Sequence, residues 1–160
     1  FVRSVAPYDG AALSRANDLF TRMRSAETHA DIDRYGPAEF SDDIRTILDA
    51  VRPTAASEVE AMWDQRAELR HELLSTMGDV LILPVASILA PPLGATRFDV
   101  DGTALSWSQA LASSRAISIL GVPSVVVPVG ASTTGQPIGV QIIAQPWHEH
   151  NALAIAELLT

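Results

Sequence analysis

The chain has 160 residues, a formal net charge of −8 and no cysteine, and all 11 of its basic residues are arginines. Its hydrophobic content of 48% and charged content of 19% are typical of a folded globular domain, which excludes a disordered chain. The acidic balance and the scattered arginines exclude nucleic acid as a partner, and no apolar run reaches the ~18 residues of a membrane span. The lack of cysteine excludes disulfides and thiolate metal sites and favours a cytoplasmic protein.

The first half of the chain predicts a short strand followed by three helices. Residues 1–7 alternate apolar and polar side chains, as a half-buried strand does. Apolar residues at helical spacing then predict amphipathic helices over residues 10–30, 41–52 and 54–77. Gly78 is a typical helix stop and is expected to end the third helix.

The second half predicts three apolar strands and two helices. In chain order these are strand 79–84, loop 85–97, turn 98–102, helix 106–120 with Arg115 facing outward, strands 122–129 and 138–144, and helix 148–160. The strands are continuous apolar runs, which is typical of strands buried on both faces. So many helices cannot all lie on one side of a small sheet, and the sequence therefore predicts an α/β fold, a mixed β-sheet with helices on both faces.

The stretch from Ser118 to Pro146 carries a specific motif. It reads G-V-P-S-V-V-V-P-V-G, then G-Q-P-I-G-V-Q-I-I-A, before a helix that opens with His148 and Glu149. This pattern closely resembles the C-terminal segment of the amidase signature family of amide hydrolases. The run from Asp79 to Pro84 is similar to that family's Asp-x-x-x-x-Pro strand. One position differs, because Ser118 stands where the family usually has asparagine.

The resemblance implies a fold and an activity. Residues 1–160 would be the C-terminal portion of a single amidase-like domain, an α/β/α sandwich whose sheet is incomplete in this chain. The complete protein would hydrolyse the C–N bond of a small-molecule carboxylic amide to acid plus ammonia or amine, through a serine acyl-enzyme and with no cofactor. Its missing N-terminal part would then be the first partner of this chain.

The resemblance also implies that the catalytic residues lie elsewhere. The family uses a serine nucleophile, a second serine in a cis peptide and a lysine base, and this chain has no lysine. We therefore assign no catalytic residue here and expect the chain alone to be inactive. The adjacent serines Ser113 and Ser114 fall in a predicted helix without a glycine-rich loop, so we interpret them as packing residues.

Other polar residues have plain structural interpretations. His148 and His150 are spaced by two, which does not suit two metal ligands on one helix face, and the sequence predicts no metal site. The segment from Asp99 to Gly102 lacks the later ligands of a calcium loop and is interpreted as a turn. Gln141 lies within a predicted buried strand, and its amide is expected to tie neighbouring loops together by hydrogen bonds.

Trp107 is the one candidate substrate-binding residue. It stands at the start of the predicted helix 106–120. In the resembling family the segment ahead of Gly-x-Pro lies near the substrate cleft, so the hypothesis is that Trp107 helps to wall the acyl pocket. The alternative is an ordinary core tryptophan.

Two further classes of function stay open. Family members that supply ammonia for transamidation carry a second arginine near the position of Arg34, where this chain has Tyr35-Gly36-Pro37-Ala38; this favours a general amidase over a glutamine amidotransferase of the A-subunit type. The other alternative is a non-catalytic scaffold or interaction module derived from an amidase. A homodimer is compatible with either.

Overall fold

The computed structural model describes residues 4–35, 51 and 53–160, with the backbone alone described for residues 32–35. The predicted helix at 41–52 lies almost entirely outside these residues. The predicted opening strand is wrong where it can be checked, because residues 4–7 form no strand. They pair with neither outer strand of the sheet, and Val5 is 90% exposed. Their alternating apolar side chains are therefore not buried against the sheet.

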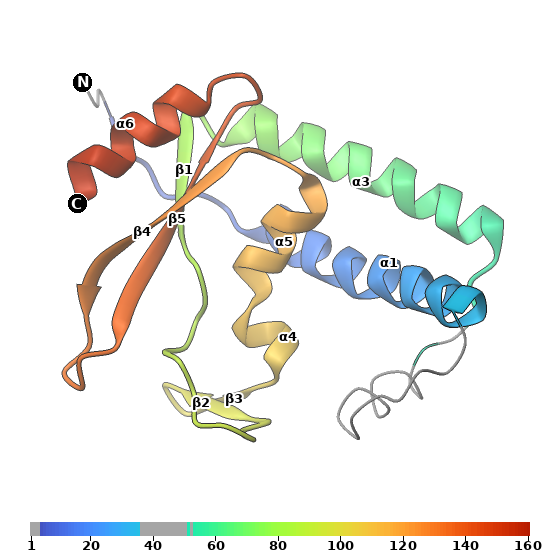
Figure 1. Cartoon of the computed structure of the whole chain (residues 1–160). Helices are drawn as coiled ribbons and strands as arrows, with labels where there is room; N and C mark the ends of the chain where they lie inside the picture. Colours follow the sequence, from blue (N-terminus) through green and yellow to red (C-terminus); the bar gives the residue numbers. More distant parts are fainter. Residues whose placement is uncertain (1–3, 36–50, 52) are drawn as a thin grey trace.

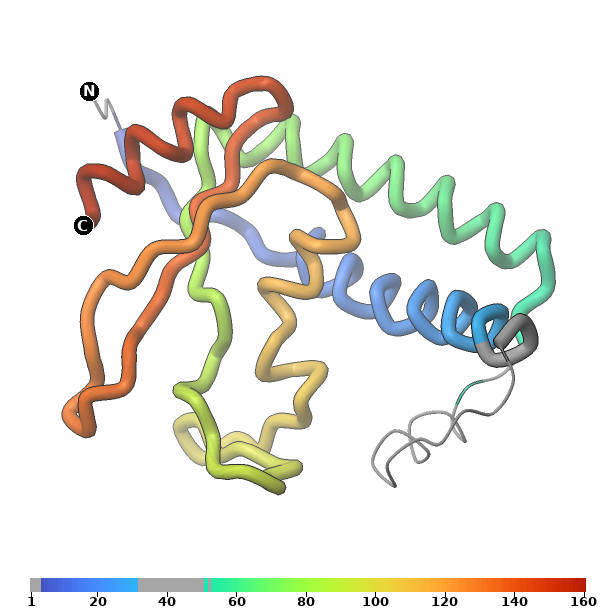
Figure 2. Tube along the Cα trace, in the orientation of Figure 1, coloured from blue at the N-terminus to red at the C-terminus, as the bar shows by residue number. Residues whose placement is uncertain are grey.

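Two long helices begin the fold. Helix α1 spans Ala11–Tyr35 and helix α3 spans Ala56–Thr76. Their buried residues recur at helical spacing and face one another, and Figure 2 shows the two helices running side by side. Gly78, with φ 73°, follows α3 in the left-handed conformation that ends a helix, as predicted.

The described strands form a sheet with the order β1-β5-β4. Strands β1 (Val80–Pro84), β5 (Pro137–Ala144) and β4 (Ser124–Ala131) pair antiparallel. Strand β4 runs two residues beyond the predicted end at residue 129, so Pro128 lies within it. Proline is tolerated there because β4 is an edge strand of the described sheet and its register shifts between Pro128 and Gly130.

Helices cover both faces of this sheet, as predicted (Figure 1). Leu81 and Ile143 pack into a core with α1, α3 and the helix α5 (Ala112–Leu120). Ile142 and Ala144 point to the other face and pack against helix α6 (Glu149–Leu159). Because successive strand residues alternate between faces, β5 supplies side chains to both cores.

The remaining elements differ from the prediction in detail. Strands β2 (Phe98–Val100) and β3 (Thr103–Leu105) form a hairpin where only a turn was expected. Its two-residue loop has positive φ at Asp101 and Gly102, which is the geometry that Asp-Gly favours. The predicted helix 106–120 is interrupted at Leu111, giving α4 (Trp107–Ala110) and α5. The carbonyl of Ala110 accepts a hydrogen bond from the backbone N–H of Ser87, at 2.8 Å, at the point where the helix is interrupted.

Candidate functional site

A hollow of about 320 Å³ lies between α5 and the strands β4 and β5. The described residues that line it combine hydroxyl groups, one amide and small apolar side chains; they are Val85, Ser114, Ile117, Ser118, Gly121, Val122, Ser124, Val126 and Gln141. Most of them come from the stretch that carries the sequence motif. The hollow is therefore the candidate functional site.

The turn after α5 shapes one wall of the hollow. Ser114, Ile117 and Ser118 lie at i, i+3 and i+4 on α5 and so share one face of that helix. Gly121 ends the helix with φ 62°, and its N–H donates to the carbonyl of Ile117 at 3.2 Å. This left-handed residue turns the chain back, so that β4 begins beside the helix it has just left.

Gln141 forms part of the floor. Its side chain is 3% exposed, and its Nε2 donates to the carbonyl of Pro84 at 3.2 Å. The hydroxyl of Ser113 donates to the same carbonyl at 2.7 Å. The prediction that this buried amide is hydrogen-bonded is confirmed, but the bond joins β5 to the end of β1 rather than two loops.

The chemistry of the wall is hydrogen bonding. None of its described residues ionises near neutral pH, so the wall offers no general acid or base of its own. Ser118, which stands where the resembling family has asparagine, is exposed at this wall. The arrangement can orient a polar ligand by hydrogen bonds, and none of the described lining residues could serve as the base that activates a serine hydroxyl.

Trp107 lies beside the β2–β3 hairpin and is not part of the lining of the hollow. Its indole Nε1 donates to the carbonyl of Ala95 at 3.1 Å, and its ring meets Phe98 edge-on with centroids 4.6 Å apart. The residue is 43% exposed. The structure brings Trp107 together with Phe98 and the loop at Ala95 but not with Gln141.

Both hydroxyls of the serine pair form hydrogen bonds to backbone carbonyls. Ser113 joins α5 to the end of β1, and the hydroxyl of Ser114 donates to the carbonyl of Leu111 within the helical segment at 3.1 Å. The rings of His148 and His150 meet edge-on, with centroids 5.8 Å apart. Within the residues that the structure describes, no group of three histidine or carboxylate side chains could hold a metal ion.

The prediction that Arg115 points outward is wrong. Its Nε donates to Asn17 Oδ1 at 2.9 Å and its Nη2 to Thr21 Oγ1 at 2.6 Å, while its guanidinium carbon lies 4.4 Å from the centroid of the Phe20 ring. Burial between α1 and α5 lowers the pKa of the Arg115 guanidinium. The helical period of α5 gives no sign of this contact, because the partners lie almost a hundred residues earlier in the chain.

Comparisons with known proteins find similarity to amidases in both the sequence and the fold of this chain. The family model described as Amidase matches residues 3–153. AmiD of Mycobacterium tuberculosis is 31% identical over 133 residues, which cover 81% of this chain and 27% of AmiD. The A subunit of glutamyl-tRNA(Gln) amidotransferase from Psychrobacter cryohalolentis is 27% identical over 88% of this chain and 26% of its own length. A crystal structure of an amidase superposes with a TM-score of 0.76 at 25% identity, over 90% of this chain and 34% of that one.

The fold is an α/β fold, and the motif at residues 118–146 lies within the residues that the family model matches. The chain belongs to the amidase family. It spans about a quarter of the length of these curated relatives, 27% and 26%. None of the helices in the described part of the chain combines the length and the apolar content that crossing a bilayer requires.

Proposed function

We propose that this chain is the C-terminal portion of an amidase that hydrolyses small-molecule carboxylic amides to acid plus ammonia or amine. A seryl acyl-enzyme would carry the acyl group, with the Ser-cisSer-Lys triad in the part of the polypeptide that precedes this chain. No metal or organic cofactor is needed for that route. The cysteine-free sequence favours a cytoplasmic location.

The observation that carries the proposal is the composition of the hollow. Three hydroxyl groups and one amide line it, and none of its described side chains can act as a base at neutral pH. Such a wall suits the recognition of an amide group, whose C=O and N–H both form hydrogen bonds. The rest of the polypeptide would close the hollow and bring the nucleophile and base to it.

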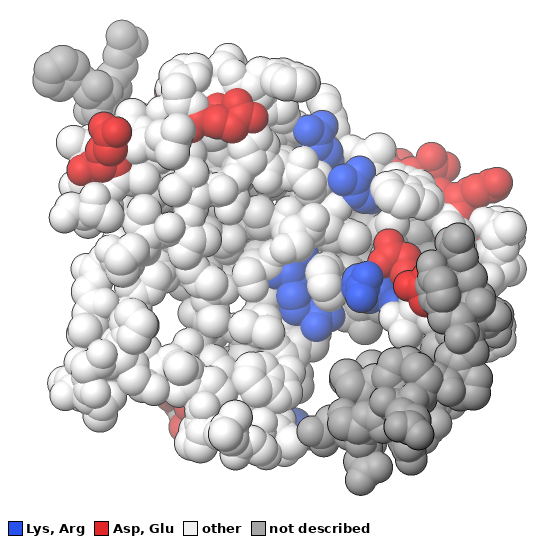
Figure 3. All heavy atoms as spheres, viewed as in Figure 1, with Lys and Arg blue, Asp and Glu red and all other residues white. Residues whose placement is uncertain are grey.

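The surface of the molecule supports the same arrangement. In the view of Figure 3, the region over β4 and β5 shows almost no charged side chains. Val126 is 58% exposed on β4, and Ile138 is 41% exposed on β5. By the register of the sheet these two side chains lie on opposite faces, so the exposed apolar side chain beside the hollow is Val126.

Ammonia release tests the proposal directly. The complete polypeptide and the isolated chain are purified separately and incubated with a short aliphatic amide and with an aryl amide. The complete polypeptide is expected to release ammonia or amine, and the isolated chain, shown to be folded by circular dichroism, is expected to release none. Hydrolysis by the isolated chain, with contaminating enzyme excluded, would contradict the proposal.

We propose further that Trp107 helps to wall the acyl pocket of the complete enzyme. Its half-exposed ring supports this role. In the complete enzyme, Trp107→Ala should change the ratio of kcat/KM between a bulky and a small acyl amide, whereas Trp63→Ala, at an exposed tryptophan on α3, should not. If Trp107→Ala lowers stability but leaves that ratio unchanged, the pocket role is wrong.

A glutamine amidotransferase is the second candidate, supported by the similarity to the glutamyl-tRNA(Gln) amidotransferase. The residues after Arg34 oppose it, because they lack the second arginine that this branch uses to hold the glutamine carboxylate. Ammonia release from glutamine by the complete polypeptide, at a rate above that for simple amides, would favour this candidate over a general amidase.

A further inference from the structure

The side-chain amide of Gln141 is held in one orientation. Its Nε2 donates to the carbonyl of Pro84 at 3.2 Å, and a backbone carbonyl can accept a hydrogen bond but cannot donate one. The hydroxyl of Ser113 donates to the same carbonyl at 2.7 Å, so both lone pairs of that oxygen are used. The nitrogen of the Gln141 amide must therefore face Pro84, and its oxygen Oε1 faces elsewhere.

Oε1 is the unpaired end of this buried amide. Within the residues that the structure describes, Oε1 accepts no hydrogen bond, although Gln141 is only 3% exposed. The described chain leaves no side-chain nitrogen or oxygen both fully buried and without a partner, so Oε1 must reach open space. Gln141 lines the hollow between α5 and the strands, and that open space is the hollow. A nearly buried acceptor, fixed by the nitrogen of its own amide, is thus available there to a donor.

The groups that share the hollow with this acceptor are neutral. By the strand register Val126 lies beside Gln141 on the same face of the sheet, and Ser124 lies two residues earlier on that face. Ser118 lines the same hollow from α5. In the described part of the chain the hydroxyls of Ser118 and Ser124 form no hydrogen bond, so both can still donate to a carbonyl.

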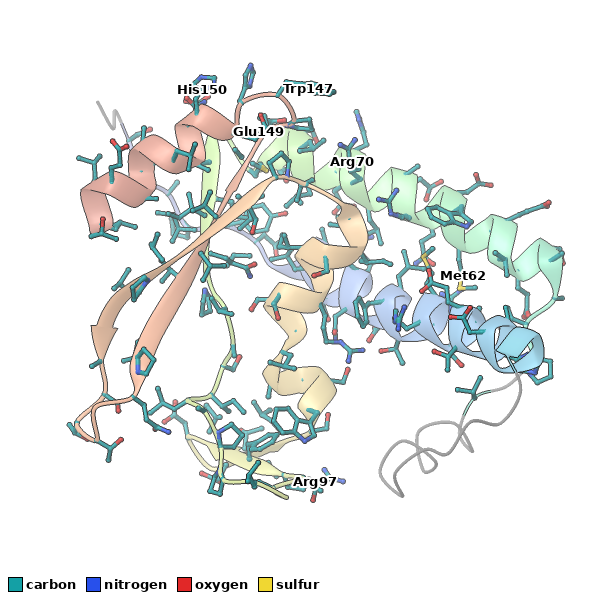
Figure 4. The ribbon with its side chains drawn as sticks, viewed as in Figure 1. Met62, Arg70, Arg97, Trp147, Glu149 and His150 are labelled. Atoms are coloured by element: carbon teal, nitrogen blue, oxygen red, sulfur yellow. The ribbon has the colours of Figure 1, made fainter. Side chains whose placement is uncertain are left out.

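None of the arginine side chains that the structure describes occupies the acceptor. Arg66 donates to carbonyls at the end of α5, and Arg115 donates to side chains on α1. Arg70 and Arg97, both labelled in Figure 4, are not part of the lining of the hollow. A donor for Oε1 therefore has to come from outside the described residues.

We propose that Gln141 Oε1 binds an N–H group that enters the hollow in the complete polypeptide. Two sources share this chemistry. One is the N–H of an amide substrate; in that form the inference rests on the proposed function and makes Gln141 a residue that selects amides over esters. The other is an N–H of the rest of the complete polypeptide, which Gln141 then joins to this chain. In both cases the acceptor is already oriented, so binding costs little side-chain freedom.

The first arm of the test compares butyramide with methyl butyrate as substrates of the complete polypeptide, because they share an acyl group and only the amide has an N–H. Gln141→Met keeps the length of the side chain and removes Oε1. If the substrate supplies the N–H, kcat/KM for butyramide should fall by about threefold to tenfold relative to methyl butyrate. Ser113→Ala is the matched control, since it removes the other donor to Pro84 but leaves Oε1, and it should not change this ratio.

The second arm needs no hydrolysis. Urea unfolding is measured for the wild type and Gln141→Met, both in the complete polypeptide and in this chain alone. Both forms lose the hydrogen bond to Pro84, so a larger fall of the urea midpoint in the complete polypeptide would identify its remaining part as the source of the N–H. Gln141→Leu, a second replacement without the acceptor, should give the same results in both arms, with the fold checked by circular dichroism.

The outcomes separate this inference from the proposed function. If the complete polypeptide hydrolyses neither substrate, the proposed function is wrong, and the urea measurements alone decide the inference. An unchanged substrate ratio together with equal falls of the midpoint in the two forms would mean that only water meets Oε1, and would overturn the inference.

Discussion

Gly121 links the helix α5 to the candidate site through its left-handed conformation. A Cβ built at this position lies 2.6 Å from Arg66 Nη2, and Arg66 in turn donates to the carbonyls of Ile119 and Leu120 at the end of α5. The glycine therefore meets two needs, because it adopts a positive φ and leaves room for the arginine that satisfies the last carbonyls of the helix.

Gly121→Ala should destabilise the protein by about 2 kcal/mol. The left-handed conformation costs an alanine about 1 kcal/mol, and displacing Arg66 costs about 1 kcal/mol more in lost hydrogen bonds. Gly78→Ala is the matched control, since Gly78 also has a positive φ but a Cβ at that position would meet nothing within 4 Å. Urea unfolding measures the loss in the free energy of unfolding for both variants, and the difference between the two losses is the contribution of the Arg66 hydrogen bonds. Equal losses would contradict the role given to that arginine.

Arg115 is a second residue whose contribution can be measured. Arg115→Met removes the donors to Asn17 and Thr21, and Asn17, which is only 8% exposed, is left without its partner. An unsatisfied buried amide costs about 1–3 kcal/mol, so we expect a loss of about 2 kcal/mol in the free energy of unfolding.

The control for Arg115 is Arg15→Met, which breaks the exposed ion pair between Arg15 and Glu72. Such pairs contribute about 0–1 kcal/mol, so this variant should lose clearly less stability. If Arg115→Met costs no more than Arg15→Met, the hydrogen bonds to α1 do not stabilise the fold as described.

At the scale of elements, the side chain of Ser113 forms hydrogen bonds from α5 to the end of β1. Ser113→Ala removes the hydrogen bonds to the carbonyls of Pro84 and Val85 and should cost about 1 kcal/mol. Ser114→Ala should have almost no effect on stability, because its hydroxyl bonds only to a carbonyl of its own helical segment and alanine is the better helix former. Thermal unfolding measures both.

The same pair of variants checks the packing role in the complete enzyme. Amide hydrolysis per folded molecule should be unchanged in Ser113→Ala, because the nucleophile is expected outside this chain. A variant with normal stability and abolished hydrolysis would instead make Ser113 part of the reaction.

Elements that local pattern determines were predicted well. The helices α1, α3 and α6 follow from apolar residues at helical spacing, and the strands β1 and β5 from continuous apolar runs. The break at Leu111 coincides with a hydrogen bond from Ser87, and Arg115 is hydrogen-bonded to Asn17 on α1. Those contacts join residues distant in the sequence, so no local pattern could indicate them.

The features of the candidate site likewise include some that local sequence pattern indicates and some that only distant contacts create. Gln141 was predicted as a buried strand residue with a bonded amide, and it is one. The hollow itself was not predicted, since it exists only because the turn at Gly121 sets α5 beside β4. Trp107 was placed by resemblance alone, and its pocket role stays a prediction.

At the scale of the whole molecule, the described sheet has open outer edges at β1 and β4. Val126 on β4 and Ile82 on β1 are 58% and 47% exposed. Unpaired strand edges with apolar side chains template association with other chains. We therefore expect the isolated chain to associate progressively with concentration. If the complete polypeptide adds strands at these edges, as the proposed function implies, it should associate much less.

Val126→Lys should reduce this association of the isolated chain, because a charge on an edge strand opposes pairing with another edge. Val5→Lys adds the same charge at a 90% exposed position outside the sheet and should have little effect. Dynamic light scattering compares the two. An isolated chain that stays monodisperse at high concentration would instead favour a stand-alone scaffold.

Ile142 and Ile143 are neighbours in the sequence, yet their side chains lie in cores on opposite faces of the sheet. The strand that carries them is hydrogen-bonded to β1 on one side and β4 on the other. Neither core can open without disturbing this strand, so both should melt in one cooperative transition. The backbone amides of β5 should then exchange with deuterium only through global unfolding and be the slowest in the molecule.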